Sequence, residues 1–96
     1  MDAVWVFNGN RGNFPSGVFS TREKAEAWIA AHKLSGCLTK YPLDIGVYEW
    51  VIAHGYWQPK QPHHHEAEFI QRFSSASQEH YHYEAGVTPP QGSTKE

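Results

Sequence analysis

Features that mark several large classes of protein are missing from this sequence. A single cysteine, Cys37, cannot form a disulfide within the chain, which argues against a disulfide-stabilised secreted scaffold. No apolar run approaches the roughly 18 residues that a membrane-spanning helix needs. The acidic start of the chain does not have the pattern of a signal peptide. We therefore expect a cytoplasmic protein without a membrane partner.

Clustered positive charge is also missing. The eight lysine and arginine residues are scattered singly, and the formal net charge is −2 with neutral histidines. Proteins that bind nucleic acid usually gather lysine and arginine on one surface, because contacts with phosphates dominate their affinity. The sequence therefore predicts no nucleic-acid partner.

Catalytic motifs are the third absence. Neither Cys37 nor the serine-rich run at 74–77 lies in a nucleophile elbow. The loop at 8–15 is rich in glycine and asparagine but lacks the Gly-Lys-Ser/Thr ending of a phosphate-binding loop. These observations predict a protein that is not an enzyme and that needs no cofactor.

Hydrophobic periodicity locates the secondary-structure elements. Apolar side chains alternate over 3–8, with Trp5 and Phe7 on one face, which predicts a central strand that is apolar on both faces. Further strands are expected at 16–19, 37–42 and 78–84, with Pro42 marking a strand end or an edge. Helices are expected at 21–34, 44–54 and 65–73, although β-branched residues leave a strand open for 47–52.

Local signals set the ends of two of these helices. Ser20 followed by Glu23 matches a capping box, and Gly36 is a natural helix stop. Asp44 can cap the second helix, and Gly55 can end it. The apolar stripes expected to face the core are Ala25, Trp28, Ile29 and His32 in the first helix, and Ile45, Tyr48, Val51 and Ile52 in the second.

The order of elements, β-β-α-β-α-α-β, predicts an α+β fold. We expect a mostly antiparallel sheet of about four strands, with two or three helices packed on one face. A single domain then covers 1–85. The glycine, proline, serine and threonine that follow predict a disordered C-terminal tail over 86–96.

Three stretches resemble a family of small uncharacterised bacterial proteins. They are GVFSTREKA at 17–25, LTKYPLD at 38–44 and RFSSASQEHYHYE at 72–84. The resemblance extends over about residues 3–86. It implies a free-standing bacterial domain, and it implies no activity and no functional residue.

Aromatic residues make up 15% of the chain, which is rich for its length. Rings of this kind supply large contact areas at low entropic cost and are enriched at binding surfaces. Tyr81 and Tyr83 share one face of the last predicted strand, and Tyr56 and Trp57 lie in the connector after the second helix. We expect a binding surface built from these four residues, while core positions stay open for Trp57 and the two strand tyrosines.

Seven histidines form the other distinctive feature. His80 and His82 are two residues apart on a predicted strand, so their rings share a face and could bind one Zn²⁺ or Ni²⁺. The run at 63–65 is a second local cluster. Neither group has the spacing of a closed ligand set, so a solvated strand face and a solvated loop remain the alternative.

These observations together favour a small non-catalytic binding module that acts through protein–protein contact. Inhibitors, immunity proteins and adaptors are bacterial proteins of this size and class, and a homodimer is also open. The alternative function is a small-molecule or metal sensor that uses the face bearing His80 and His82.

Overall fold

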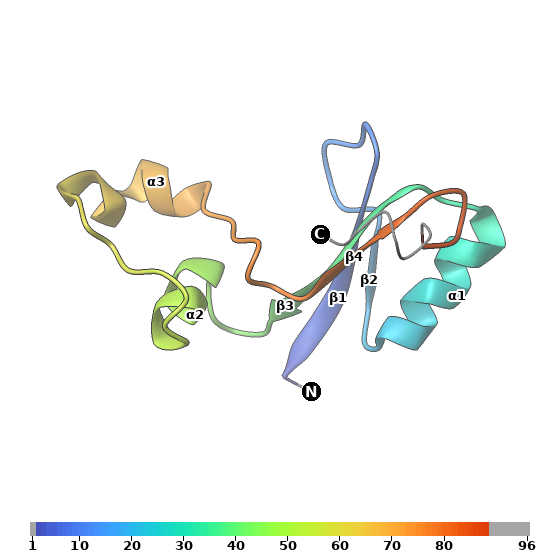
Figure 1. The fold of residues 1–96 in the computed structure, drawn as a ribbon, viewed down its shortest axis with the longest axis horizontal. Helices are drawn as coiled ribbons and strands as arrows, with labels where there is room; N and C mark the ends of the chain where they lie inside the picture. The colour runs from blue at the N-terminus through green and yellow to red at the C-terminus, as the bar shows by residue number, and fades with distance from the viewer. Residues whose placement is uncertain (1, 89–96) are drawn as a thin grey trace.

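The computed structural model describes residues 2–88, which form a four-stranded antiparallel sheet and a set of short helices (Figure 1). The strand order in the sheet is β2-β1-β3-β4. The elements are β1 (Ala3–Gly9), β2 (Gly17–Phe19), α1 (Arg22–His32), β3 (Gly36–Pro42), α2 (Val47–Ala53), the 3₁₀ helix η1 (Pro62–His65), α3 (Ala67–Gln71) and β4 (His80–Tyr83). The predicted α+β class and the predicted order of strands and α-helices are confirmed.

Strand β1 is central in the sheet, as its two apolar faces predict. It pairs with β2 on one side and with β3 on the other, and Phe7 lies opposite both Gly17 and Leu38. Leu38 in turn lies opposite Tyr81 of β4. Directly opposed residues of antiparallel strands point to the same face, so the register lines up apolar side chains across the sheet.

Helix α1 covers that apolar face and completes the main hydrophobic core. Ala25 and Ile29 of α1 are fully buried against the sheet. Trp28 is half-buried at the margin, where its ring meets Phe7 and Phe19 at centroid distances of 5.7 and 5.3 Å. The buried core residues are Trp5, Phe7, Ala25, Ile29, Leu38 and Tyr83.

The predicted signals at the ends of α1 are wrong in detail. The N-cap is Thr21, not Ser20, and its hydroxyl accepts a hydrogen bond from the Lys24 amide at 3.2 Å. The helix ends at Lys33, which itself adopts the left-handed conformation with φ of 54°. Gly36 instead begins β3, where a Cβ atom would clash with the Asn8 carbonyl. Close strand packing, not helix termination, is therefore what requires this glycine.

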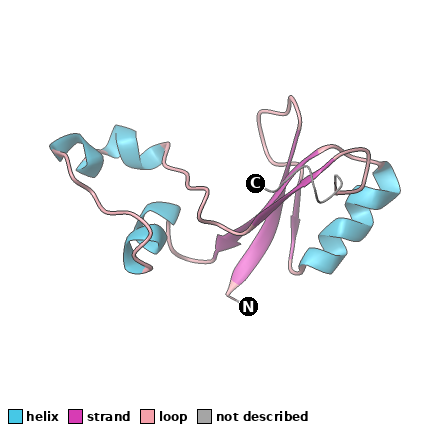
Figure 2. Ribbon diagram, viewed as in Figure 1, coloured by secondary structure: helices cyan, strands magenta, loops and turns pink. Residues whose placement is uncertain are grey.

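The later helices form a separate part of the molecule, beyond the end of β3, instead of packing on the sheet (Figure 2). The element at 47–53 is a helix, which settles the alternative left open for that segment. Asp44 does not cap it: Asp44 lies in a turn with φ of 62°, and the N-cap is Gly46. Ile45 consequently precedes the helix and is 42% exposed.

Aromatic stacking holds this second part together. The ring of Tyr48 in α2 meets Phe73 at 5.5 Å and Trp57 at 5.9 Å, and Trp57 meets Phe69 of α3 at 5.8 Å. The Tyr48 hydroxyl donates a hydrogen bond to the His64 carbonyl at 2.8 Å, which ties η1 to α2. We call these residues, Tyr48, Trp57, His64, Phe69 and Phe73, the α2–α3 cluster.

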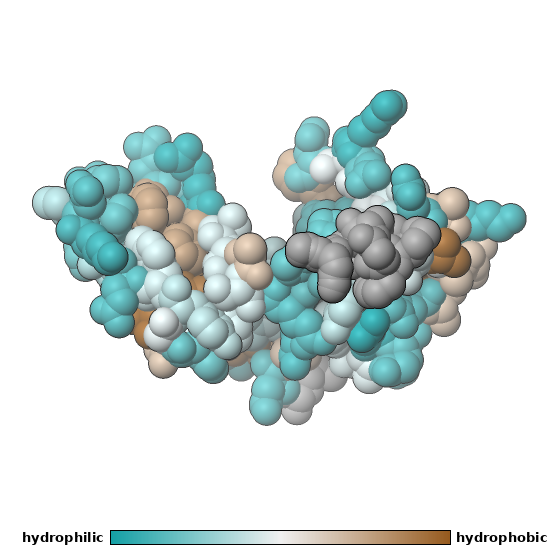
Figure 3. Space-filling view, in the orientation of Figure 1, coloured by the Kyte–Doolittle hydropathy of each residue, from teal (hydrophilic) through white to brown (hydrophobic). Residues whose placement is uncertain are grey.

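Two chain segments join the second part to the sheet, and the surface is indented between the two parts (Figure 3). The segment before β4 is anchored by Gln78, which is 3% exposed and donates from Nε2 to the Lys40 carbonyl at 3.2 Å. The Lys40 amide donates to the Glu79 carbonyl at 2.9 Å. These bonds hold the segment before β4 against β3.

Residues 86–88, the first part of the predicted tail, are described by the structure. The Gly86 amide donates to the Leu34 carbonyl at 2.8 Å, and Glu84 and Val87 form an isolated β-bridge. The turn that follows β4 therefore packs against the segment after α1, and ordered contacts continue past the predicted boundary at 85. The remainder of the predicted tail, 89–96, lies outside the described residues. Within 2–88, no helix has the length and apolar content to cross a bilayer.

Candidate binding groove

The four aromatic residues predicted to form one binding surface come from two parts of the chain. Tyr56 and Trp57 belong to the part of the molecule built from α2 and α3, whereas Tyr81 and Tyr83 lie on β4. Tyr56 is 54% exposed, and Tyr83 is only 5% exposed. Trp57 and Tyr81 are half-buried. Partner binding by these four residues stays a prediction, and Tyr83 is the most buried of them.

Tyr83 is a core residue. Its ring packs with the apolar face under α1, and its hydroxyl donates to Glu26 Oε2 at 2.5 Å. Burial, together with this bond to a carboxylate, raises the pKa of the Tyr83 phenol well above its ordinary range. The side chain is committed to joining β4 to α1 and is not available to a partner.

Tyr81 is held by charged neighbours at the edge of the same core. The guanidinium carbon of Arg22 lies 3.6 Å from the centre of its ring, and its hydroxyl donates to Glu79 Oε2 at 2.5 Å. The hydrogen bond to Glu79 raises the pKa of the Tyr81 phenol. Arg22 also lies 3.1 Å from Glu26 through its Nε atom. Tyr81 is thus partly covered by an arginine of its own chain.

Trp57 is part of the packing between α2 and α3. Its indole contacts Phe73 at a centroid distance of 5.0 Å and His64 at 5.2 Å, besides Tyr48 and Phe69. A half-buried ring with four aromatic neighbours holds its helices together. These contacts give Trp57 a packing role, and its part in a binding surface stays a prediction.

Tyr56 belongs to a different group of rings, which sequence analysis missed. Its ring centre lies 5.6 Å from that of Trp50 and 5.9 Å from that of His54. Trp50 and His54 are 4.6 Å apart and are four residues apart on α2 and its C-cap. We call Trp50, His54 and Tyr56 the aromatic trio. The signal available in the sequence was the i, i+4 spacing of Trp50 and His54, off the apolar stripe of the helix.

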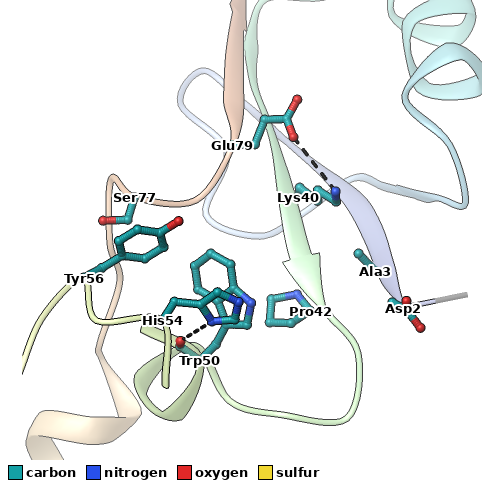
Figure 4. Close-up of a pocket in the computed structure, with 9 residues that line it drawn as sticks. All are labelled: Asp2, Ala3, Lys40, Pro42, Trp50, His54, Tyr56, Ser77 and Glu79. Atoms are coloured by element: carbon teal, nitrogen blue, oxygen red, sulfur yellow. Dashed lines mark hydrogen bonds and ion pairs between the residues drawn. The ribbon is translucent and has the colours of Figure 1, made fainter. Parts of the chain in front are cut away.

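The aromatic trio lines a cavity of about 380 Å³ between α2 and the end of the sheet (Figure 4). The opposite wall comes from β1 and β3, with Ala3, Lys40 and Pro42. Asp2, Ser77 and Glu79 complete the lining. In Figure 4, Tyr56 and Trp50 lie on the α2 side while Lys40 and Glu79 lie across from them. The cavity thus has an aromatic wall and a charged wall.

A second hollow, of about 690 Å³, continues from the first toward the start of α1. It shares four lining residues with the first hollow and adds others that include Trp5, Arg22 and Glu23. The shared residues are Asp2, Ala3, Lys40 and Glu79. The two hollows therefore form one surface depression, which we call the groove.

Two polar contacts define the chemistry of the groove. His54 Nδ1 lies 2.9 Å from the Trp50 carbonyl. A carbonyl oxygen only accepts, so Nδ1 donates and Nε2 is the acceptor of the neutral ring. Lys40 Nζ lies 4.0 Å from Glu79 Oε1, and both side chains are nearly half exposed. This pair faces the aromatic trio across the cavity.

The histidines predicted as a metal site lie away from the groove. His80 and His82 share a face of β4, with ring centres 5.4 Å apart, and His80 Nδ1 lies 2.7 Å from the Gln78 carbonyl. Over residues 2–88, no three or more histidine, cysteine, aspartate or glutamate side chains gather as a set of metal ligands. The proximity of the two rings follows the predicted spacing, and metal binding by this pair stays a prediction.

The run of histidines at 63–65 is not a simple solvated loop. It lies in η1, and His64 Nδ1 accepts hydrogen bonds from the amides of Lys60 at 3.0 Å and Gln61 at 3.2 Å. The His64 ring also packs against Phe69 in a tilted arrangement, with ring centres 4.7 Å apart. Its ring therefore has a structural role, which requires an unprotonated Nδ1.

This arrangement predicts that acid destabilises the α2–α3 cluster. Partial desolvation and the neighbouring His63 and His65 lower the pKa of His64 below its ordinary value of 6.5. The unfolded chain then binds the proton more readily, so the stabilisation is complete above pH 6.5 and is lost as the pH falls through the lower folded value. We expect the thermal midpoint to drop between about pH 7.5 and about pH 5.5.

Thermal unfolding of two variants checks the assignment to His64. The variant His64→Asn keeps an acceptor but does not titrate, so its midpoint should change less over the same pH range. His32→Gln, an exposed histidine on α1, serves as the control and should retain the full pH dependence. An unchanged pH dependence in His64→Asn would show that other groups cause it.

Comparison with known proteins gives one match. The model of a family described as "Domain of unknown function (DUF7710)" matches residues 4–89. Searches of the curated proteins and of the solved structures found no match.

Proposed function

Because the chain belongs to this family of unknown function, we propose its role from its own geometry: a non-catalytic module that binds another protein through the groove. The observation that carries the proposal is the aromatic trio, with Tyr56 54% exposed at the rim of a concave surface. Exposed aromatic rings next to a hollow are typical anchors of protein interfaces. The resemblance to bacterial proteins and the lone cysteine support a site of action in the bacterial cytoplasm.

The extent of the groove favours a protein segment over a small ligand. Small-molecule sites are concave spaces of about 300–1,000 Å³ that surround most of their ligand. Here the two hollows adjoin at the end of the sheet, where they share Asp2, Ala3, Lys40 and Glu79, so an extended segment of a partner can lie across both. A small-molecule ligand confined to the first hollow is the second candidate, supported by its volume of about 380 Å³.

The charges of the groove support a protein partner over a nucleic acid. Its basic side chains have acidic neighbours: Lys40 lies 4.0 Å from Glu79, and Arg22 lies 3.1 Å from Glu26. Phosphate recognition needs basic groups that are free to neutralise the ligand. A groove with both acidic and basic side chains, in which lysine and arginine have acidic neighbours, fits a polar protein surface better than a nucleic acid.

Affinity capture from the native host tests this proposal. Truncation of a central interface ring typically costs 2 kcal/mol or more, about thirtyfold in affinity. We expect Tyr56→Ala to lose the captured partner at this level while its melting stays close to wild type. The matched control is Phe14→Ala, since Phe14 is 79% exposed in the β1–β2 loop. Equal capture by both variants would place the interface elsewhere, and a second copy of the chain as the captured protein would indicate a homodimer.

A further inference from the structure

The hydrogen-bonding groups of the groove are unequally divided between acceptors and donors. The carboxylates of Asp2 and Glu79 only accept; Glu79 Oε2 already accepts from the Tyr81 hydroxyl, and Oε1 lies 4.0 Å from Lys40 with no hydrogen bond. His54 donates from Nδ1 to the Trp50 carbonyl, so Nε2 is the acceptor in this tautomer. The hydroxyls of Ser77 and Tyr56 can do either. Lys40 is the one ammonium in the first hollow, as lined by the described residues, and it is already near Glu79. The groove therefore has spare acceptors and few spare donors.

Charge and ring chemistry point in the same direction. The lining of the first hollow has two carboxylate side chains against one ammonium, an excess of one acidic group. Aromatic faces carry negative potential and attract cations, and tryptophan does so best. The Trp50 indole lies in the same wall as His54 and Tyr56 (Figure 4). A cation that also donates several hydrogen bonds satisfies both requirements.

From these features we propose that the groove binds the guanidinium group of an arginine side chain presented by the partner protein. This inference rests on the proposed function, because it names the group that the partner places in the first hollow. The guanidinium stacks on the aromatic trio and donates to the carboxylates of Glu79 and Asp2. The flanking residues of the partner then extend toward the second hollow.

A guanidinium fits better than the other groups that a protein can offer. A carboxylate of the partner would be repelled by the excess of acidic side chains, and it could not hydrogen-bond to groups that only accept. An ammonium satisfies the charge, but it is strongly hydrated and cannot stack its plane on a ring, whereas a guanidinium is planar, weakly hydrated and has five donors. The chain itself shows this mode of contact nearby, where Arg22 lies 3.6 Å from the ring centre of Tyr81 and bonds Glu26.

A peptide titration tests the inference directly. The full chain labelled with ¹⁵N is titrated with the peptide acetyl-Gly-Gly-Arg-Gly-Gly-amide, and the signals of the Trp50 indole and of the His54 and Tyr56 amides are followed. Peptides with lysine, citrulline or glutamate at the centre are compared. We expect saturable shifts with arginine and at least about tenfold weaker binding of citrulline, which keeps the shape but loses the charge. Added salt should weaken the arginine complex.

Variants locate the binding site. Tyr56→Ala and Glu79→Gln should each weaken binding of the arginine peptide, and Phe14→Ala should leave it unchanged. Equal binding of arginine and citrulline, or shifts unaffected by Tyr56→Ala, would overturn the inference. So would free arginine amide binding as tightly as the peptide, since the ligand would then be a small cation and not a partner segment.

The two proposals fail in different ways. If Tyr56→Ala loses the native partner while no arginine peptide binds, the groove is the interface but the recognised group is not a guanidinium. If the arginine peptide binds at the trio and the native partner is still captured by Tyr56→Ala, the arginine site exists but the partner uses another surface, which contradicts the inference as stated.

Discussion

Truncation of Phe7 to alanine is expected to destabilise the domain by about 3–5 kcal/mol, because the change empties the centre of a close-packed core. Phe7 is 1% exposed, lies on the central strand and faces both Leu38 and Gly17. Its ring also makes an edge contact with Trp28. Since domains of this size have only about 5–15 kcal/mol of stability, the variant should unfold far below the wild-type midpoint or fail to fold.

Urea unfolding of a matched pair measures this effect. Phe14→Ala removes the same atoms from a side chain that is 79% exposed, so it should change the free energy of unfolding by no more than about 0.5 kcal/mol. If the two variants lose similar stability, the core does not lie between β1 and α1.

Truncation of Trp57 to alanine should cost about 3 kcal/mol, at the low end of the range for aromatic truncation because the ring is half-buried. The loss should be concentrated in the α2–α3 cluster, where Trp57 touches rings of Tyr48, Phe69 and Phe73. We therefore expect faster amide exchange in α2 and α3 while the sheet stays protected.

The adjacent residue is the control. Tyr56→Ala removes a ring that is 54% exposed and should leave the exchange rates of both helices close to wild type. If Trp57→Ala is stable and its amide exchange is unchanged, Trp57 is not needed for packing and is available to bind a partner.

Much of the fold was predictable because its signals are local. Alternation over 3–8 predicted the central strand that the structure has. Of the stripe predicted to face the core in α1, Ala25 and Ile29 are fully buried, Trp28 is half-buried and His32 is exposed. The errors fall where a local signal had an equally good neighbour. Thr21 occupies the N-cap position that was predicted for Ser20, because the two adjacent residues both have a hydroxyl group that can accept the capping hydrogen bond.

Gly36 and Asp44 show a different limit. Glycine after a helix predicts a stop, but Gly36 is required by the close approach of Asn8 from β1, a contact between distant parts of the chain. Asp44 suits an N-cap, but it also tolerates the left-handed turn in which it lies, with φ of 62°. Long-range packing therefore explains Gly36, whereas at Asp44 one local preference replaced another.

The groove was not predictable from the sequence for the same reason. Its aromatic wall comes from α2 and the residues that follow it, and its charged wall comes from the end of the sheet, so distant parts of the chain form it. The prediction of an aromatic surface near Tyr56 found one member of the trio. It grouped Tyr56 with Trp57, its neighbour in sequence, and missed Trp50 and His54, which the helical spacing brings next to Tyr56.

Site-specific photo-crosslinking in the native host tests the central claim, that the groove is the protein-binding surface. Benzoylphenylalanine replaces Tyr56 in one variant and Phe14 in the other, two exposed aromatic positions in different parts of the molecule. The groove predicts that illumination couples a discrete partner protein to position 56 and couples no such partner to position 14. Crosslinking at position 14 alone, or equal crosslinking at both positions, would contradict the claim.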